Sequence, residues 1–116
     1  MRVLIVEDEP LLAMALEDIL AQLGHEIAGS AATVSQALSM LDAEQIDCAL
    51  LDYSLSEDTT SLPIAQRLIS AGKPFYFLTG YTHLEEEIPL NSRLLTKPIS
   101  PAQLKGALSE MMPLHC

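Results

Sequence analysis

The sequence predicts an α/β domain in which a doubly wound, five-stranded parallel sheet has helices on both faces. Short apolar runs alternate along the chain with segments of helical spacing, an order that is typical of a parallel sheet. The apolar runs are continuous, as expected of strands that are buried on both faces. With 116 residues the chain is long enough for one core, so we expect a single domain over residues 1–116.

The N-terminal half is predicted to fold as strand, helix, strand, helix. The apolar run at residues 3–6 is the first strand. Pro10 can occupy the first turn of the helix that follows, and Gly24 can end that helix. A weaker strand at residues 26–31 precedes a second helix, which opens with the Thr33–Gln36 spacing of a capping box.

The C-terminal half continues the alternation. Residues 48–51 and 75–78 are buried strands, and a polar loop over residues 52–61 leads from the first of them into a helix opened by Pro63. Residues 93–96 form the fifth strand.

Two further helices are predicted around the fifth strand. The segment 80–92 contains Pro89 and three consecutive glutamates and has little apolar periodicity, so its helix should be short or irregular. Ser100 and Pro101 are a strong N-cap and first-turn pair for the last helix.

Composition excludes several classes of partner. The formal net charge is −10, and the six Lys and Arg residues are scattered singly, which argues against direct binding of nucleic acid or of anionic lipid. The apolar run that precedes the first acidic residues is too short for a signal peptide or a membrane span. We therefore expect a soluble, cytoplasmic protein.

Polar side chains follow four of the predicted strands. Glu7 and Asp8 follow the first strand, Asp52 the third, Thr79 the fourth and Lys97 the fifth. Because the carboxyl ends of parallel strands share one edge of a sheet, these side chains should meet there. Crowded carboxylates repel one another unless a cation lies among them. Mg²⁺ is the cation that best suits a few carboxylates together with water and phosphate oxygens.

Such a site suits phosphoryl transfer. The carboxylate of Asp52 could attack a phosphoryl group and form an aspartyl phosphate. Lys97 and the metal would neutralise the phosphoryl oxygens, and the hydroxyl group of Thr79 could hydrogen-bond to the product. Taken one at a time, these residues also fit a solvated strand end, a loop acid and a surface lysine, so the hypothesis rests on their joint occurrence.

These motifs resemble those of the receiver domains of bacterial two-component response regulators, over nearly the whole chain. The matching stretches are VED, LLDYSL, FLTGY and LTKPIS. The resemblance implies a flavodoxin-like strand order 2-1-3-4-5. It also implies that Asp52 is the phosphoacceptor, that Glu7, Asp8 and Asp52 bind Mg²⁺, and that a sensor histidine kinase or a phosphotransfer protein is the phosphodonor.

Three positions bear on how far the family pattern extends. Ser54 stands where many receivers have Asn, but the expected metal ligand there is a backbone carbonyl, which any residue provides. Leu94 stands where many receivers have a Tyr or Phe that rotates inward on activation, so an aromatic switch is missing, and Leu94 can also be read as a core residue. Tyr81 is a candidate to replace that switch, against its reading as an exposed loop residue.

The run PFYFLTGYT at residues 74–82 resembles the FATGUY subgroup of receivers, with Leu78 in place of Ala. This resemblance implies a kinase of the HWE type. We expect a stand-alone receiver that acts on an unknown downstream protein or serves as a phosphate sink, and that is not a turnover enzyme. Two alternatives stay open, a phosphorylation-independent pseudo-receiver that only binds a partner and a small aspartate-based phosphatase.

Overall fold

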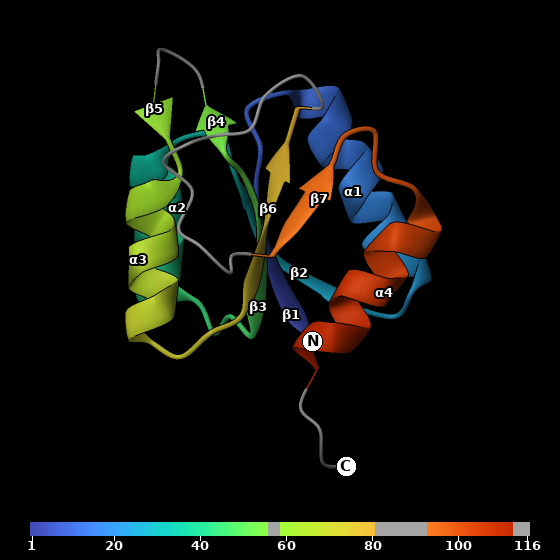
Figure 1. The fold of residues 1–116 in the computed structure, drawn as a ribbon. Helices are drawn as coiled ribbons and strands as arrows, with labels where there is room; N and C mark the ends of the chain where they lie inside the picture. Colours follow the sequence, from blue (N-terminus) through green and yellow to red (C-terminus); the bar gives the residue numbers. More distant parts are fainter. Residues whose placement is uncertain (56–58, 81–92, 113–116) are drawn as a thin grey trace.

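A parallel sheet forms the centre of the molecule in the computed structural model, which describes residues 1–55, 59–80 and 93–112. Its strands run in the same direction, so their carboxyl ends lie at one edge (Figure 1). The spatial order β2-β1-β3-β6-β7 confirms the predicted fold class and strand order. The strands are β1 (Arg2–Val6), β2 (Glu26–Ala31), β3 (Cys48–Asp52), β6 (Phe75–Thr79) and β7 (Leu94–Thr96).

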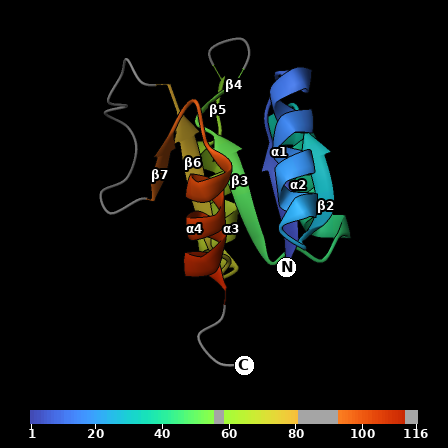
Figure 2. The ribbon, with the colours of Figure 1, turned by 90° about the vertical axis from the view of Figure 1, so that its right-hand side faces the viewer.

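Helices cover both faces of the sheet. In Figure 1, α2 and α3 lie on one side and α1 and α4 on the other, and Figure 2 shows α1 and α4 from the front. The described residues form the helices α1 (Pro10–Gln22), α2 (Val34–Ala43), α3 (Leu62–Ser70) and α4 (Pro101–Met111). None of these helices is long and apolar enough to cross a bilayer. The short or irregular helix predicted within residues 80–92 falls, apart from Gly80, outside the described residues.

Two apolar cores hold the layers together. Successive side chains of β1 point to opposite faces of the sheet, so Leu4 and Val6 pack with α2 and α3, while Val3 and Ile5 pack with α1 and α4. All four side chains are fully buried. The continuous apolar run is therefore explained by burial on both faces, as the sequence predicted.

Side-chain caps start two of the helices. At α4, Ser100 Oγ accepts a hydrogen bond from the Gln103 amide at 3.1 Å and Gln103 Oε1 accepts one from the Ser100 amide at 2.9 Å, which completes a capping box. At α2, Thr33 Oγ1 accepts a hydrogen bond from the Gln36 amide at 3.1 Å. The predicted return bond is displaced, because Gln36 Oε1 accepts from the amide of Ala32, at 2.9 Å.

A small hairpin occupies part of the segment predicted as a polar loop. Antiparallel strands β4 (Ser54–Leu55) and β5 (Thr59–Thr60) follow β3. The hairpin is closed at its base by a 2.9 Å hydrogen bond from the Ser61 amide to the carbonyl oxygen of Tyr53. Leu55 anchors the hairpin to the domain, because its side chain belongs to the apolar core that includes residues of α2 and α3.

The cap of α4 gives a first prediction. Ser100→Ala removes the acceptor for the Gln103 amide and should lower the free energy of unfolding by about 1 kcal/mol, measured by urea denaturation. Ser109→Ala, at an exposed position inside the same helix, is the matched control and should not destabilise the protein, since alanine favours helix interiors. Equal losses in the two variants would contradict the assigned cap.

Candidate functional site

The register of the sheet brings the predicted acidic residues to the same level. Val6 of β1 pairs with Leu51 of β3, so Glu7, the next residue after β1, lies level with Asp52 at the end of β3. Glu7 is also held to the neighbouring strand, because its amide donates a 2.9 Å hydrogen bond to the carbonyl oxygen of Ala31. The backbone therefore directs these carboxylates to the carboxyl edge of the sheet.

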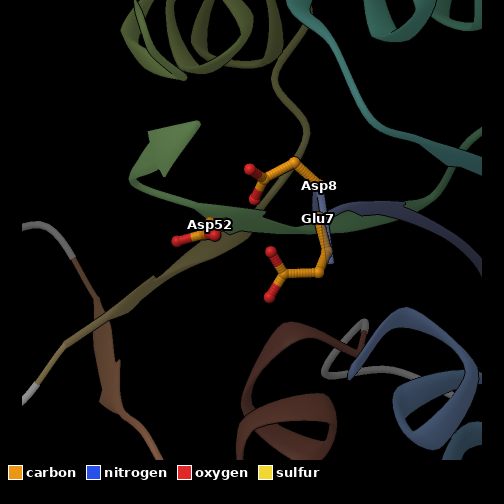
Figure 3. Close-up of side chains that lie close together, drawn as sticks. All are labelled: Glu7, Asp8 and Asp52. Carbon is orange, nitrogen blue, oxygen red and sulfur yellow. The ribbon is translucent and has the colours of Figure 1, made fainter. Parts of the chain in front are cut away.

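Three carboxylates gather at this edge. Glu7 and Asp8 extend from the end of β1 toward Asp52 (Figure 3), and one oxygen from each of the three side chains lies within 4.8 Å of the others. Glu7 is 2% exposed and Asp52 6% exposed, while Asp8 is half-buried. Oxygen ligands at this spacing suit a hard divalent cation such as Mg²⁺, so the donor set fits the predicted metal.

Lys97, the residue that follows β7, also contacts this cluster. Its ammonium nitrogen lies 3.1 Å from Glu7 Oε1 and 3.1 Å from Asp52 Oδ2. Its backbone amide donates a 2.8 Å hydrogen bond to the carbonyl oxygen of Thr79, which fixes the start of the side chain at the end of β6. The predicted meeting of Glu7, Asp8, Asp52 and Lys97 is therefore observed.

Burial and charge change the acid–base properties of the cluster. Burial, followed by a hydrogen bond and charge repulsion from Asp52, raises the pKa of Glu7 to about 7, and Lys97 offsets only part of this rise. Burial alone would lower the pKa of Lys97, but the charges of Asp52 and Glu7 outweigh it and raise that pKa above its usual value. The cluster thus holds more negative charge than one lysine compensates.

The remaining predicted site residues are Thr79, Ser54 and Tyr81. Thr79 is buried at the end of β6, one residue beyond the Asp52–Leu78 pair of the sheet, and so belongs to the same edge. Ser54 lies in β4 with an exposed side chain. Tyr81 lies outside the described residues.

Leu94 is not a core residue. Its side chain is 44% exposed on β7, which is an edge strand of the sheet. The interpretation of Leu94 as part of the core is therefore wrong. An edge strand has a neighbouring strand on one side only, so fewer side chains from adjacent strands are available to cover Leu94.

Tyr53 is a positioning residue that the sequence did not single out. Its amide donates to the carbonyl oxygen of Leu78 and its own carbonyl oxygen accepts from Ser61, each at 2.9 Å. Its ring packs edge-to-face on Phe77 at 5.6 Å. These contacts hold the backbone next to Asp52 on both sides. The sequence does contain a signal for this role, because an aromatic residue stands directly after Asp52, at the end of the stretch LLDY.

Comparisons with known proteins agree with this geometry. A family model described as "Response regulator receiver domain" matches residues 3–109. The phyllosphere-induced regulator PhyR of Methylorubrum extorquens is 32% identical over 114 residues, which are 95% of this chain and 43% of that protein. The chain therefore spans less than half the length of this relative.

Two solved structures of SdrG have the same fold. The solution structure of SdrG from Sphingomonas melonis Fr1 is 35% identical, with a TM-score of 0.84 over 96% of this chain and 95% of that one. The BeF3-activated conformation of SdrG, from Pseudomonas melonis Fr1, is 37% identical, with a TM-score of 0.78 over 93% and 92% of the two chains. Both similarities extend over nearly the whole of each chain.

The raised pKa of Glu7 predicts how stability changes with pH when no metal is bound. The folded protein binds the Glu7 proton more tightly than the unfolded chain does, since its pKa is about 7 instead of 4.5. The free energy of unfolding should therefore fall as the pH rises from about 4.5 through 7, by on the order of 3 kcal/mol at most. Glu7→Gln should remove this fall, so the variant should be the more stable protein at pH 8 in EDTA.

Urea denaturation across this pH range measures the effect. Glu9→Gln is the matched control, because Glu9 is exposed, and it should keep the wild-type slope. Parallel pH profiles for wild type and Glu7→Gln would show that the Glu7 proton is not linked to folding.

Proposed function

Because the chain belongs to the response regulator receiver domain family, we propose that it is a phosphorylation-controlled switch with Asp52 as the phosphoacceptor. The observation that carries this proposal is the position of Lys97, 3.1 Å from the carboxylate of Asp52 and beside a cluster of three acidic side chains. A carboxylate, a lysine and ligands for a hard cation are the groups that phosphoryl transfer requires.

The proposed reaction is transfer from a phosphohistidine. A carboxylate oxygen of Asp52 attacks the phosphorus atom, the phosphorus–nitrogen bond breaks, and the imidazole of the donor leaves and takes up a proton. Glu7, Asp8 and Asp52, with the backbone carbonyl of Ser54, would hold Mg²⁺, which neutralises phosphoryl oxygens when bound. Lys97, whose ammonium group contacts the carboxylate of Asp52, would stabilise the same charge.

The switch is proposed to start at the end of β6. Thr79 follows Leu78, which pairs with Asp52 in the sheet. The carbonyl oxygen of Thr79 accepts a hydrogen bond from the amide of Lys97. Movement of the Thr79 hydroxyl and the Lys97 ammonium toward a new phosphoryl group would therefore shift both strand ends together. Because Leu94 is partly exposed on the edge strand, we propose that this shift does not use a buried rotating side chain, and Tyr81 is the candidate aromatic.

The proposed partners follow from the same family membership. The phosphodonor is a sensor histidine kinase, of the HWE type by the FATGUY-like run at residues 74–82, or a phosphotransfer protein, in the cytoplasm. The BeF3-activated conformation of SdrG supports control by phosphorylation, since beryllofluoride mimics a phosphoryl group. The output is an interaction with another protein or the drainage of phosphoryl groups from a shared kinase.

Phosphorylation tests the assignment of Asp52. Incubated with a phosphorylated HWE-type kinase and Mg²⁺, the protein should gain one phosphoryl group per chain by intact-mass spectrometry, and none after Asp52→Asn or with EDTA. Labelling of the Asp52→Asn variant would refute the assignment. Continuous release of phosphate over many turnovers would instead identify an aspartate-based phosphatase.

Metal binding is tested without any phosphodonor. Mg²⁺ at about 100 times its dissociation constant should raise the free energy of unfolding by about 2.7 kcal/mol and the melting temperature by several degrees. Asp8→Asn should suppress most of this rise, whereas Asp18→Asn, at an exposed position of α1, should keep it. An unchanged melting temperature of the wild type at saturating Mg²⁺ would contradict the metal site and favour a pseudo-receiver.

A further inference from the structure

A cavity of about 390 Å³ lies between the start of α2 and the β4–β5 hairpin. Figure 1 shows the hairpin at the carboxyl edge of the sheet, the edge that carries the acidic cluster. A buried water needs only roughly 15 Å³, so the cavity has room for a long side chain. Its lining residues are Asp8, Ala32, Thr33, Val34, Ser35, Leu55 and Thr59.

Within the described part of the chain, the lining has one charged member, Asp8. The others are aliphatic or carry hydroxyl groups, and no Lys, Arg or His is among the lining residues that the structure describes. Ala32, Thr33 and Ser35 are exposed, so this rim is open to solvent. The cavity is therefore open to solvent at this rim and is bordered by a carboxylate of the acidic cluster.

The charge of the cluster that borders the cavity is negative. Three carboxylates of the cluster lie within 4.8 Å of one another, and the lysine of the cluster, Lys97, contacts Glu7 and Asp52. Asp8 is the member of the cluster that lines the cavity. An anionic occupant would be repelled there, whereas a cationic one would be attracted.

We propose that the cavity receives an arginine side chain from a partner protein. The aliphatic stem of arginine would pack on Val34 and Leu55 while its guanidinium group donates hydrogen bonds to the carboxylate of Asp8. Arginine is favoured over lysine because its planar group matches a carboxylate and is more weakly hydrated. The formal net charge of −10 favours a basic partner surface at longer range.

Arginine binding and metal binding oppose each other in this arrangement, because both cations draw on the charge of Asp8 and two cations beside one carboxylate repel each other. This part rests on the proposed function, in which Asp8 helps to hold Mg²⁺. The partner would then bind the metal-free, unphosphorylated protein and leave when the metal and the phosphoryl group arrive. A ligand that distinguishes two states in this way shifts the equilibrium between them.

The test uses a matched pair of peptides with the full chain. Acetyl-Ala-Arg-Ala-amide is titrated into metal-free, ¹⁵N-labelled protein at low salt, and the control peptide has citrulline, which is uncharged and of the same shape, in place of arginine. The arginine peptide should give saturable shifts of the amide signals of residues 8, 32–35, 55 and 59, with at least tenfold tighter binding than the citrulline peptide. Saturating Mg²⁺ should reverse these shifts.

Two lysine variants locate the binding site. Ser35→Lys adds a cation of the chain's own at the exposed rim and should weaken binding of the arginine peptide at least fivefold. Ser39→Lys makes the same change in charge on the same helix at an exposed position outside the lining, and binding should stay within twofold of wild type.

Three outcomes would overturn the inference: equal binding of the two peptides, equal losses in the two lysine variants, or shifts that persist at saturating Mg²⁺. The Mg²⁺-dependent rise in melting temperature, measured without peptide, reports on the metal site by itself. A protein that shows this rise but no arginine-specific shifts would refute the cavity proposal and leave the proposed function intact.

Discussion

The contacts of Lys97 with Glu7 and Asp52 are the interaction on which the site depends. They join the ends of β1 and β3 to the chain that follows β7, at 3.1 Å in each case. Burial, followed by the hydrogen bond and charge of Asp52, raises the pKa of Glu7 to about 7, and the contact with Lys97 offsets only part of this rise. Carboxylates held this close repel one another when all are ionised, which is the physical reason that a divalent cation suits this edge of the sheet.

The rest of the fold can sustain this cluster because its stability comes from elsewhere. Two apolar cores, one on each face of the sheet, completely bury the apolar side chains of β1 and β3. These two strands lie next to each other inside the sheet, so the acidic residues at their ends are held by backbone pairing and packing. A fold stabilised in this way tolerates local repulsion where function requires it.

The features that local patterns encode were predictable from the sequence. Each polar site residue follows an apolar strand, so strand order alone placed Glu7, Asp8, Asp52 and Lys97 at one edge. The β4–β5 hairpin was not predictable, because two-residue strands have no period and depend on Tyr53, Ser61 and Leu55 for their position. The hydrogen bond from the Ala32 amide to Gln36 was not predictable either, because tertiary packing decides it. The exposure of Leu94 depends on the position of its strand at the edge of the sheet.

The most direct test of the acidic cluster is to locate a bound ion. Mn²⁺ accepts the same oxygen ligands as Mg²⁺. It broadens the NMR signals of nearby nuclei, and the effect falls steeply with their distance from the ion. Substoichiometric Mn²⁺ should first remove the amide signals around Glu7, Asp8 and Asp52, while the exposed acids Glu26 and Glu44, which contact Arg2, keep theirs. Broadening centred on Glu26 and Glu44, or spread evenly over the acidic surface, would contradict the account.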